Sequence, residues 1–138
     1  LGRFLRLDVL APRSALDPAH GVDPNLRAAV LHLSYRDLDL LLPADAESEV
    51  TTALALPRVE VLKVAHHASA DEGTGALLAR LRPAAAVIPV GAHNRYGHPH
   101  PATVATLRSA VPRVYRTDRD GDVTLTLGPT GPAIRSER

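Results

Sequence analysis

Alternating hydrophobic and polar residues at the start of the chain predict β-strands. Residues 5–9 alternate with a period of two, which predicts an opening strand. Residues 11–26 contain Pro, Asp and Gly and are typical of a loop. The same alternation returns over 30–35 and 38–42, on either side of Arg36-Asp37. These two segments therefore predict a β-hairpin.

The middle of the chain alternates between short helical and apolar segments. Residues 46–56 have a helical composition that stops at Pro57, and the apolar run 59–65 predicts a buried strand. A helix with leucines at helical spacing follows, with Asp71 as its expected N-cap, and it ends at Arg82-Pro83.

The last third of the chain continues the alternation of strand and helix. The apolar run 84–90 predicts a strand, and a proline inside it indicates a strand end or edge. Pro101 suits the first turn of a helix. Apolar residues at 114–115 and 123–127 flank Asp120-Gly121, which predicts a closing hairpin. This order predicts an α/β layered domain with a partly parallel, partly antiparallel sheet.

Composition limits the kinds of chemistry that this domain can carry. The 138 residues fit one domain, and with only 3% aromatic residues Ala, Val and Leu must fill the core. A net charge of +1 gives no argument from bulk electrostatics for binding nucleic acid. Cysteine is absent, so any metal site must use His and carboxylate ligands.

The chain shows no sign of a membrane segment or of a natural start. No apolar run approaches the roughly 18 residues that a membrane helix needs, and no signal peptide opens the chain. The sequence begins at Leu1 and contains no Met. We therefore expect it to be a piece of a longer polypeptide.

Side chains that bind metals or transfer protons follow three successive predicted strands. The strands end just before Asp45, before the pair His66-His67, and before a loop that contains His98. In layered α/β folds the carboxyl ends of the strands line the functional crevice. Carboxylate and neutral imidazole are the ligands of a hydrolytic zinc or manganese site. We expect these residues to meet at one edge of the sheet.

Each of these residues also has a structural interpretation. Asp45 could cap the helix that follows it. His98 and His100 could be ordinary residues of a loop stiffened by prolines. Ser69 is expected to cap the next helix rather than to act as a nucleophile. Tyr96 could donate a hydrogen bond to a substrate phosphate or simply pack against its neighbours.

Four segments of the chain carry recognisable motifs. The segments are LDLLLPAD at 38–45, VLKVAHHAS at 61–69, VIPVGAHNRYGHPHP at 87–101 and VYRTDRDG at 114–121. Together they resemble the metallo-β-lactamase-fold domain of ComEC-type DNA-uptake proteins. Taken singly the motifs are weak, but the four together are specific, and they occur in the order and spacing of that family over roughly residues 25 to 127.

The resemblance implies both a fold and an activity. It implies the C-terminal half of a metallo-β-lactamase αββα sandwich, with a mixed sheet and flanking helices, over residues 1–128. Residues 129–138 would be a polar tail. It also implies part of a metal-dependent phosphodiesterase or nuclease, which would act on the DNA strand that is not imported. Such enzymes hold two divalent ions, zinc or manganese, about 3.5–4 Å apart.

Position in the family's motifs assigns roles to the candidate residues. Asp45 would be the carboxylate that bridges the metals, and His66 and His98 would be metal ligands. His67 would transfer a proton, although the resemblance leaves open which residue of the pair binds metal.

The loop that contains His98 would also take part in catalysis. Asn94 and Tyr96 would shape it and complete the catalytic group.

The chain departs from the family in three places. The family's HxHxDH ligand motif lies upstream of the matched region and is absent here, so the site is incomplete and the fragment alone is expected to be inactive. Ala44 and Ala68 stand where the family has glycine. Because alanine resists the backbone conformations that glycine permits, we expect both turns to fit within ordinary dihedral angles.

The resemblance also implies partners and a location. The partners would be single-stranded DNA, the missing N-terminal half of the domain, and the membrane channel domain of the parent protein. The chain would be a soluble domain of a bacterial inner-membrane protein, and half of a two-part fold should expose an apolar face. Two alternatives stay open, because a fold does not fix a function. They are a non-catalytic domain that guides DNA or docks, and a lactonase or small phosphodiesterase.

Overall fold

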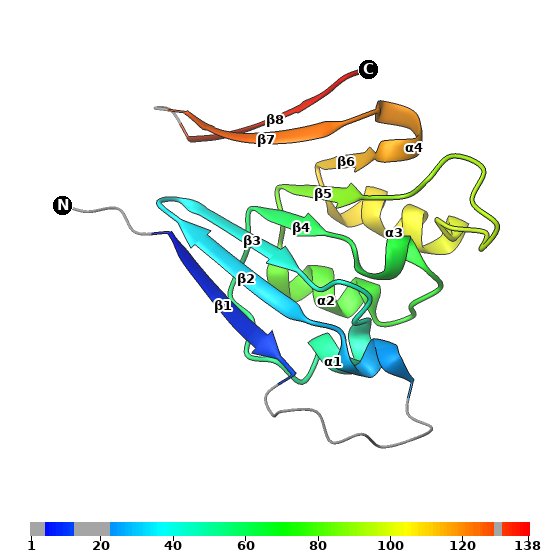
Figure 1. Ribbon diagram of the computed structural model, residues 1–138, viewed down its shortest axis with the longest axis horizontal. Coiled ribbons are helices and arrows are strands. Elements are labelled where there is room, and N and C mark those ends of the chain that lie inside the picture. The colour runs from blue at the N-terminus through cyan, green and yellow to red at the C-terminus, as the bar shows by residue number, and fades with distance from the viewer. Residues whose placement is uncertain (1–4, 13–22, 129–130) are drawn as a thin grey trace.

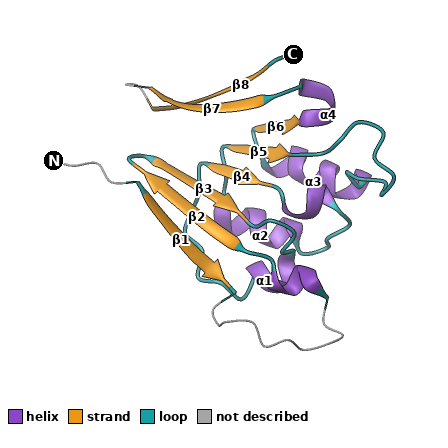
Figure 2. Cartoon of the chain, viewed as in Figure 1, coloured by secondary structure: helices purple, strands orange, loops and turns teal. Residues whose placement is uncertain are grey.

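The computed structural model describes residues 5–12, 23–128 and 131–138. The chain forms an α/β fold in which a six-stranded mixed sheet is flanked by helices, and a separate two-stranded sheet follows (Figure 1, Figure 2). The strands are β1 (Arg6–Ala11), β2 (Val30–Tyr35), β3 (Leu38–Leu42), β4 (Val61–Lys63), β5 (Ala85–Ile88), β6 (Arg113–Arg116), β7 (Val123–Gly128) and β8 (Gly131–Ser136). The helices are η1 (Pro24–Arg27), α1 (Ser48–Thr51), η2 (Ala65–Ala68), α2 (Thr74–Leu81), α3 (Pro101–Ala110) and α4 (Thr117–Asp120). The predicted α/β class with a mixed sheet and flanking helices is confirmed.

The six strands of the large sheet lie in sequence order, and this order fixes where their ends point. β1, β2 and β3 pair antiparallel, so the predicted hairpin of β2 and β3 is confirmed. β3, β4, β5 and β6 pair parallel. The segments that follow β3, β4 and β5 therefore leave the sheet at the same edge.

The core lies between this sheet and the helices α2 and α3. Leu41, Leu62 and Ala86 occupy matched positions on β3, β4 and β5 and share one face of the sheet. Leu78 of α2 and Leu107 of α3 pack against that face. All five side chains are at most 2% exposed. Burial of aliphatic surface is the main stabilising term for such a fold, and it is achieved here without aromatic residues.

The predicted closing hairpin around Asp120-Gly121 is wrong. β6 pairs with β5, whereas β7 pairs with β8, and α4 lies between β6 and β7. Two sets of hydrogen bonds turn the chain there. The Thr117 hydroxyl accepts from the Val90 amide and donates to the Val90 carbonyl, each at 2.8 Å, and the Asp120 carboxylate accepts from the Arg116 amide at 2.6 Å.

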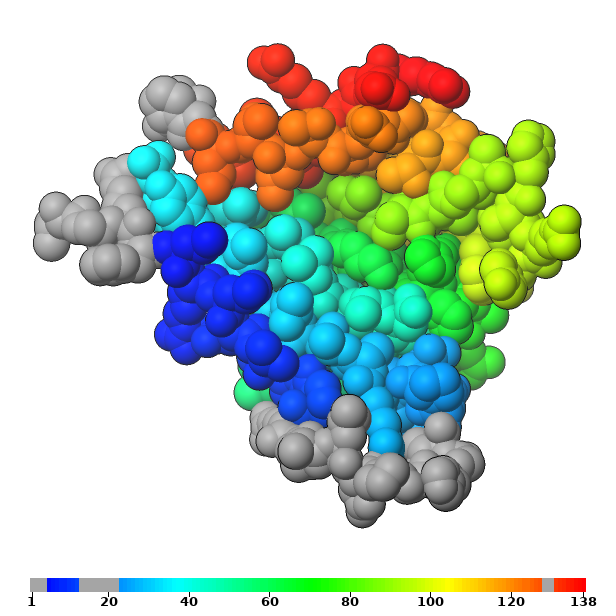
Figure 3. Space-filling model, viewed as in Figure 1, coloured from blue at the N-terminus to red at the C-terminus, as the bar shows by residue number. Residues whose placement is uncertain are grey.

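The segment 131–136, assigned from the sequence to a polar tail, forms strand β8. It pairs antiparallel with β7 along its whole length. The space-filling view shows the two strands, coloured orange to red, along one side of the molecule (Figure 3). A domain boundary at residue 128 stays a prediction.

The helix that follows η2 begins later than the sequence predicts. The expected N-cap Asp71 is wrong, because α2 begins at Thr74 with Gly73 as its N-cap. The Asp71 carboxylate instead accepts from the Ser48 amide at 3.0 Å, from the Ser48 hydroxyl, and from the Gly73 amide at 3.0 Å. Asp71 thereby connects the start of α1 to the start of α2.

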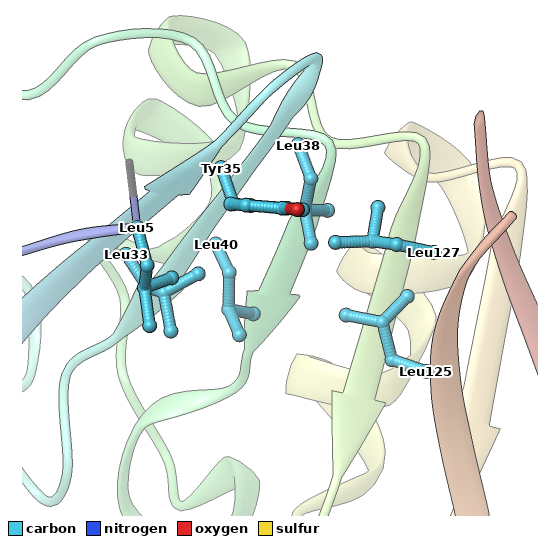
Figure 4. A pocket seen from close by; sticks show the side chains of 7 residues that line it. All are labelled: Leu5, Leu33, Tyr35, Leu38, Leu40, Leu125 and Leu127. Carbon is cyan, nitrogen blue, oxygen red and sulfur yellow. The ribbon is translucent and has the colours of Figure 1, made fainter. Parts of the chain in front are cut away.

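An apolar groove of about 380 Å³ lies between β7 and the large sheet (Figure 4). Leu125 and Leu127 of β7 line one side of it. The residues that line the groove from the side of the large sheet are Leu5, Leu33, Tyr35, Leu38 and Leu40.

The described chain also presents apolar side chains to solvent at the first strand of the large sheet. Leu5, which precedes β1, and Leu7 and Val9 of β1 are 55–64% exposed. Among the described helices, none has both the length and the apolar character needed to cross a membrane.

Candidate functional site

The candidate residues that follow three parallel strands come together at one edge of the sheet. Asp45 follows β3, His66 and His67 lie in η2 directly after β4, and His98 lies in the loop after β5. The ring centres of His66 and His98 are 5.4 Å apart, and those of His67 and His98 are 6.4 Å apart. The distance between His67 Nε2 and Asp45 Oδ1 is 3.9 Å. The four residues therefore form one cluster, as the strand ends predict.

The backbone reaches this cluster through left-handed conformations. His66, His67 and Ala68 have φ values of 42°, 52° and 60°, and Ala44 has a φ of 51°. The expectation that Ala44 and Ala68 fit within ordinary dihedral angles is wrong. Left-handed conformation costs roughly 1–2 kcal/mol for a residue with a Cβ. Hydrogen bonds offset this cost, because the Ala44 carbonyl accepts from the His66 amide at 3.0 Å and the Ala68 carbonyl accepts from the His100 amide at 2.7 Å.

The imidazole of His67 is oriented by a backbone carbonyl. Its Nδ1 lies 2.5 Å from the carbonyl oxygen of Pro89, just after β5. A carbonyl oxygen only accepts hydrogen bonds, so this contact places the proton of a neutral imidazole on Nδ1. Nε2 then carries the free lone pair, and it faces the carboxylate of Asp45. His67 is thus held with a basic nitrogen directed into the cluster.

The imidazole of His66 is oriented in the same way by the carboxylate of Glu47, a residue that the sequence patterns did not indicate. Its Nδ1 lies 2.9 Å from Oε1 of Glu47, and the Ser69 hydroxyl donates to the same oxygen. The proton of His66 therefore sits on Nδ1, which leaves Nε2 free. Ser69 does not cap the helix that follows it, contrary to the expectation, because α2 begins at Thr74 with Gly73 as its N-cap.

Asp45 does not cap the helix that follows it. The N-cap of α1 is Glu47, and it makes no side-chain capping bond. The Asp45 side chain is 44% exposed and faces His67. Lys63, a residue that was not predicted as part of the site, donates a hydrogen bond from Nζ to the Ala44 carbonyl at 2.6 Å. Burial lowers the pKa of the Lys63 ammonium, and the nearby Asp45 carboxylate partly opposes this shift.

The loop after β5 is organised by the side chain of Asn94. Its Oδ1 accepts from the amides of Tyr96 and His98 at 3.2 and 3.1 Å. Its Nδ2 donates to the carbonyls of Gly91 and His98 at 3.2 and 2.5 Å. Both acceptor and donor groups of Asn94 are thus used within the loop, so Asn94 determines how the loop presents its other side chains.

His98 and Tyr96 lie side by side on this loop. Their rings are nearly parallel, with an interplanar angle of 15° and centres 6.2 Å apart. Tyr96 is 85% exposed. The pKa of His98 lies below its ordinary value, chiefly because burial disfavours the cation, and the neighbouring imidazoles of His66 and His67 add to the shift.

The described residues do not by themselves form a metal site. Across the described ranges, no group of three or more His, Asp or Glu side chains is arranged to hold a metal ion. The cluster nevertheless holds two imidazoles with free Nε2 atoms and one exposed carboxylate. Such a group can accept a proton, stabilise the resulting cation and contribute part of a ligand set.

Comparisons with known proteins found two proteins that contain a segment similar to this chain. The chain is 33% identical to ComE operon protein 3 of Bacillus subtilis (strain 168) over 123 aligned residues, and this alignment covers 86% of the chain. It is 29% identical over 125 residues to Recombination protein 2 of Haemophilus influenzae, which covers 89% of this chain. The chain spans only 15% of the length of each of these curated relatives. No family model matches the chain, and no solved structure matches it.

Proposed function

We propose that this chain is part of a phosphodiesterase or nuclease domain in a DNA-uptake protein of the ComEC type, where it acts on one DNA strand. Similarity to ComE operon protein 3 and Recombination protein 2 over most of the chain supports the role in DNA uptake. One observation carries the proposed chemistry. His66 and His67 are both held through Nδ1, so that two basic Nε2 atoms are free at the same sheet edge as Asp45.

This arrangement suits the hydrolysis of a phosphodiester bond. Nε2 of His67 would accept a proton from a water molecule as the water oxygen forms a bond to phosphorus. The carboxylate of Asp45, 3.9 Å away, would stabilise the imidazolium that results. The bond from phosphorus to the leaving oxygen then breaks, and the imidazolium returns the proton to that oxygen. Each step uses groups of this chain and water.

Metal dependence and the remaining partners are further parts of this proposal. Asp45, His66 and His98 would be the contribution of this chain to a site for two divalent ions, zinc or manganese. The other ligands would come from the missing N-terminal half of the domain. That half would also cover the apolar groove beside β7, and the membrane channel domain of the parent protein would deliver the strand.

Cleavage of single-stranded DNA by the full-length protein that carries this sequence tests the proposal. A 5′-labelled oligonucleotide is incubated with Mn²⁺ or Zn²⁺, and the products are separated by electrophoresis. We expect the Asp45→Ala and His67→Ala variants to lose roughly 10²–10⁴-fold in rate, since a positioned acid–base group contributes about that much. His93→Ala is the matched control, because His93 is an exposed imidazole of the same loop and should cut like wild type.

Two outcomes would contradict the proposal. Cleavage that persists unchanged both in Asp45→Ala and after chelation would remove the enzymatic role assigned to this cluster. Binding of DNA without any cleavage by the wild type would instead support a non-catalytic domain that guides DNA.

A further inference from the structure

A cavity adjoins the cluster of Asp45, His66, His67 and His98 (the His cluster) and shares His67 and His98 with it. It encloses about 210 Å³, less than the roughly 300–1,000 Å³ of pockets that hold whole drug-sized ligands. It therefore has room for a small group rather than for a drug-sized ligand. The residues that line it are His67, Val90, Gly91, Asn94, Tyr96 and His98.

The exposed ring of Tyr96 forms one wall of this cavity, and Asn94 fixes the backbone that carries it. Asn94 accepts from the Tyr96 amide and fixes the backbone on both sides of His98. The phenol ring is nearly parallel to the His98 imidazole at a centre distance of 6.2 Å. The loop projects from the molecule in the yellow-green segment of the space-filling view (Figure 3). Its geometry therefore presents a flat aromatic face to solvent directly beside the cluster.

We propose that Tyr96 and this cavity form a subsite for a nucleobase next to the phosphate that the His cluster acts on. This inference rests on the proposed function and adds how the strand is recognised. Every base has a π-face that stacks on an aromatic side chain, and such stacking requires a base that is not already stacked in a duplex. The site thus selects single strands.

The polar groups around the cavity make this subsite tolerant of base identity. The Asn94 amide, the side chain in the lining best suited to read the edge of a base, uses both its donor and acceptor groups within the loop. Recognition therefore depends on stacking rather than on a pattern of donors and acceptors. Oligo(dT) and oligo(dA) should bind with similar affinities.

Binding of fluorescent decamers to the full-length protein that carries this sequence tests the subsite by anisotropy, in EDTA so that the strand is not cut. The probes are an oligo(dT) and an abasic oligonucleotide with the same number of phosphates. Tyr96→Ala should weaken oligo(dT) binding about tenfold, in line with the stacking contribution of one base. Tyr96→Phe keeps the ring and should bind oligo(dT) like wild type. Both variants should bind the abasic probe as wild type does.

The outcomes separate the subsite from the proposed function. If Tyr96→Phe weakens binding of both probes as much as Tyr96→Ala does, the hydroxyl contacts a phosphate and the nucleobase subsite is overturned, while DNA binding stands. If Tyr96→Ala binds both probes like wild type, the subsite is overturned in the same way. If wild type binds neither probe, the subsite and the DNA substrate fall together. Tyr96 is 85% exposed, so these substitutions leave the core intact.

Discussion

Replacing Ala44 with glycine should stabilise this chain by about 0.5–1 kcal/mol. Ala44 has a φ of 51°, a left-handed conformation that costs a residue with a Cβ roughly 1–2 kcal/mol and costs glycine almost nothing. Glycine has more conformational freedom in the unfolded chain, which takes back about 0.4–1 kcal/mol. The relief of backbone strain is the larger of the two terms, so the net change favours folding.

Ala68→Gly should be close to neutral, although Ala68 has a similar φ of 60°. Ala68 is 1% exposed and belongs to the hydrophobic core. Removing one buried carbon costs about 0.8 kcal/mol, which cancels the gain from relieved strain. Ala44 is only partly buried, so it keeps most of its gain. The two alanines therefore separate backbone strain from burial.

Urea denaturation of the 138-residue chain, followed by far-ultraviolet circular dichroism, measures both effects. For Ala44→Gly we expect a higher urea midpoint and a rise in Tm of roughly 2–5 °C. Ala105→Gly is the control, because Ala105 is exposed within α3 and glycine there should cost about 1 kcal/mol. If Ala44→Gly lowers the midpoint as much as Ala105→Gly does, the reasoning from left-handed strain is wrong.

Two further predictions concern the packing between α1 and the start of α2, and the ion pair at the turn after β6. Gly73→Ala should lower the urea midpoint by an amount equivalent to about 1–3 kcal/mol, because the added Cβ would clash with the side chain of Ser48. Adding Ser48→Gly to this variant should restore part of the lost stability. If the double variant shows no recovery, the clash is not the cause. Hydrogen bonds from Arg116 hold the pKa of the Asp118 carboxyl below its ordinary value of 3.8. The stabilisation that this pair gives the folded state is therefore fully present above pH 3.8. It is lost as the pH falls through the lower pKa that Asp118 has in the folded state. Asp118→Asn should therefore cost about 1–2 kcal/mol at pH 7 and much less near pH 2, measured by urea midpoints at both pH values; an equal cost at both would refute the assignment.

Patterns along the sequence were sufficient to place the candidate cluster. Period-two alternation identified β2 and β3, and the apolar runs identified β4 and β5. In a layered α/β fold such runs pair in parallel, and their ends meet at one edge. Asp45, the His66-His67 pair and His98 could therefore be grouped before any contact between them was known.

The partner of β7 could not be read from the same patterns. Alternation shows that Val123, Leu125 and Leu127 share one face, but it does not say which strand lies beside them. The hydrogen bonds of Thr117 with Val90 decide this, since they turn the chain into α4 instead of a hairpin. Such a contact joins residues that lie 27 positions apart.

The contacts that orient the His pair were hidden for a related reason. Glu47 belongs to a stretch with ordinary helical composition, and its contact with His66 exists only because η2 places His66 beside the residue that precedes α1. Its one sequence signal is its place two residues after Asp45. The left-handed conformations of Ala44 and Ala68 were hidden as well, because alanine gives no sign of a positive φ.

Lys63 gives this chain an unusual chemical property. It is the single lysine in the sequence, and it lies at the end of β4 beside the Ala44 turn. An amine with a lowered pKa is more often unprotonated, and the unprotonated form is the one that reacts with acylating reagents. Amine-directed labels and crosslinkers that modify a side chain within these 138 residues must therefore attach at the margin of the candidate site. The yield of labelling at Lys63 would report how open that margin is to solvent.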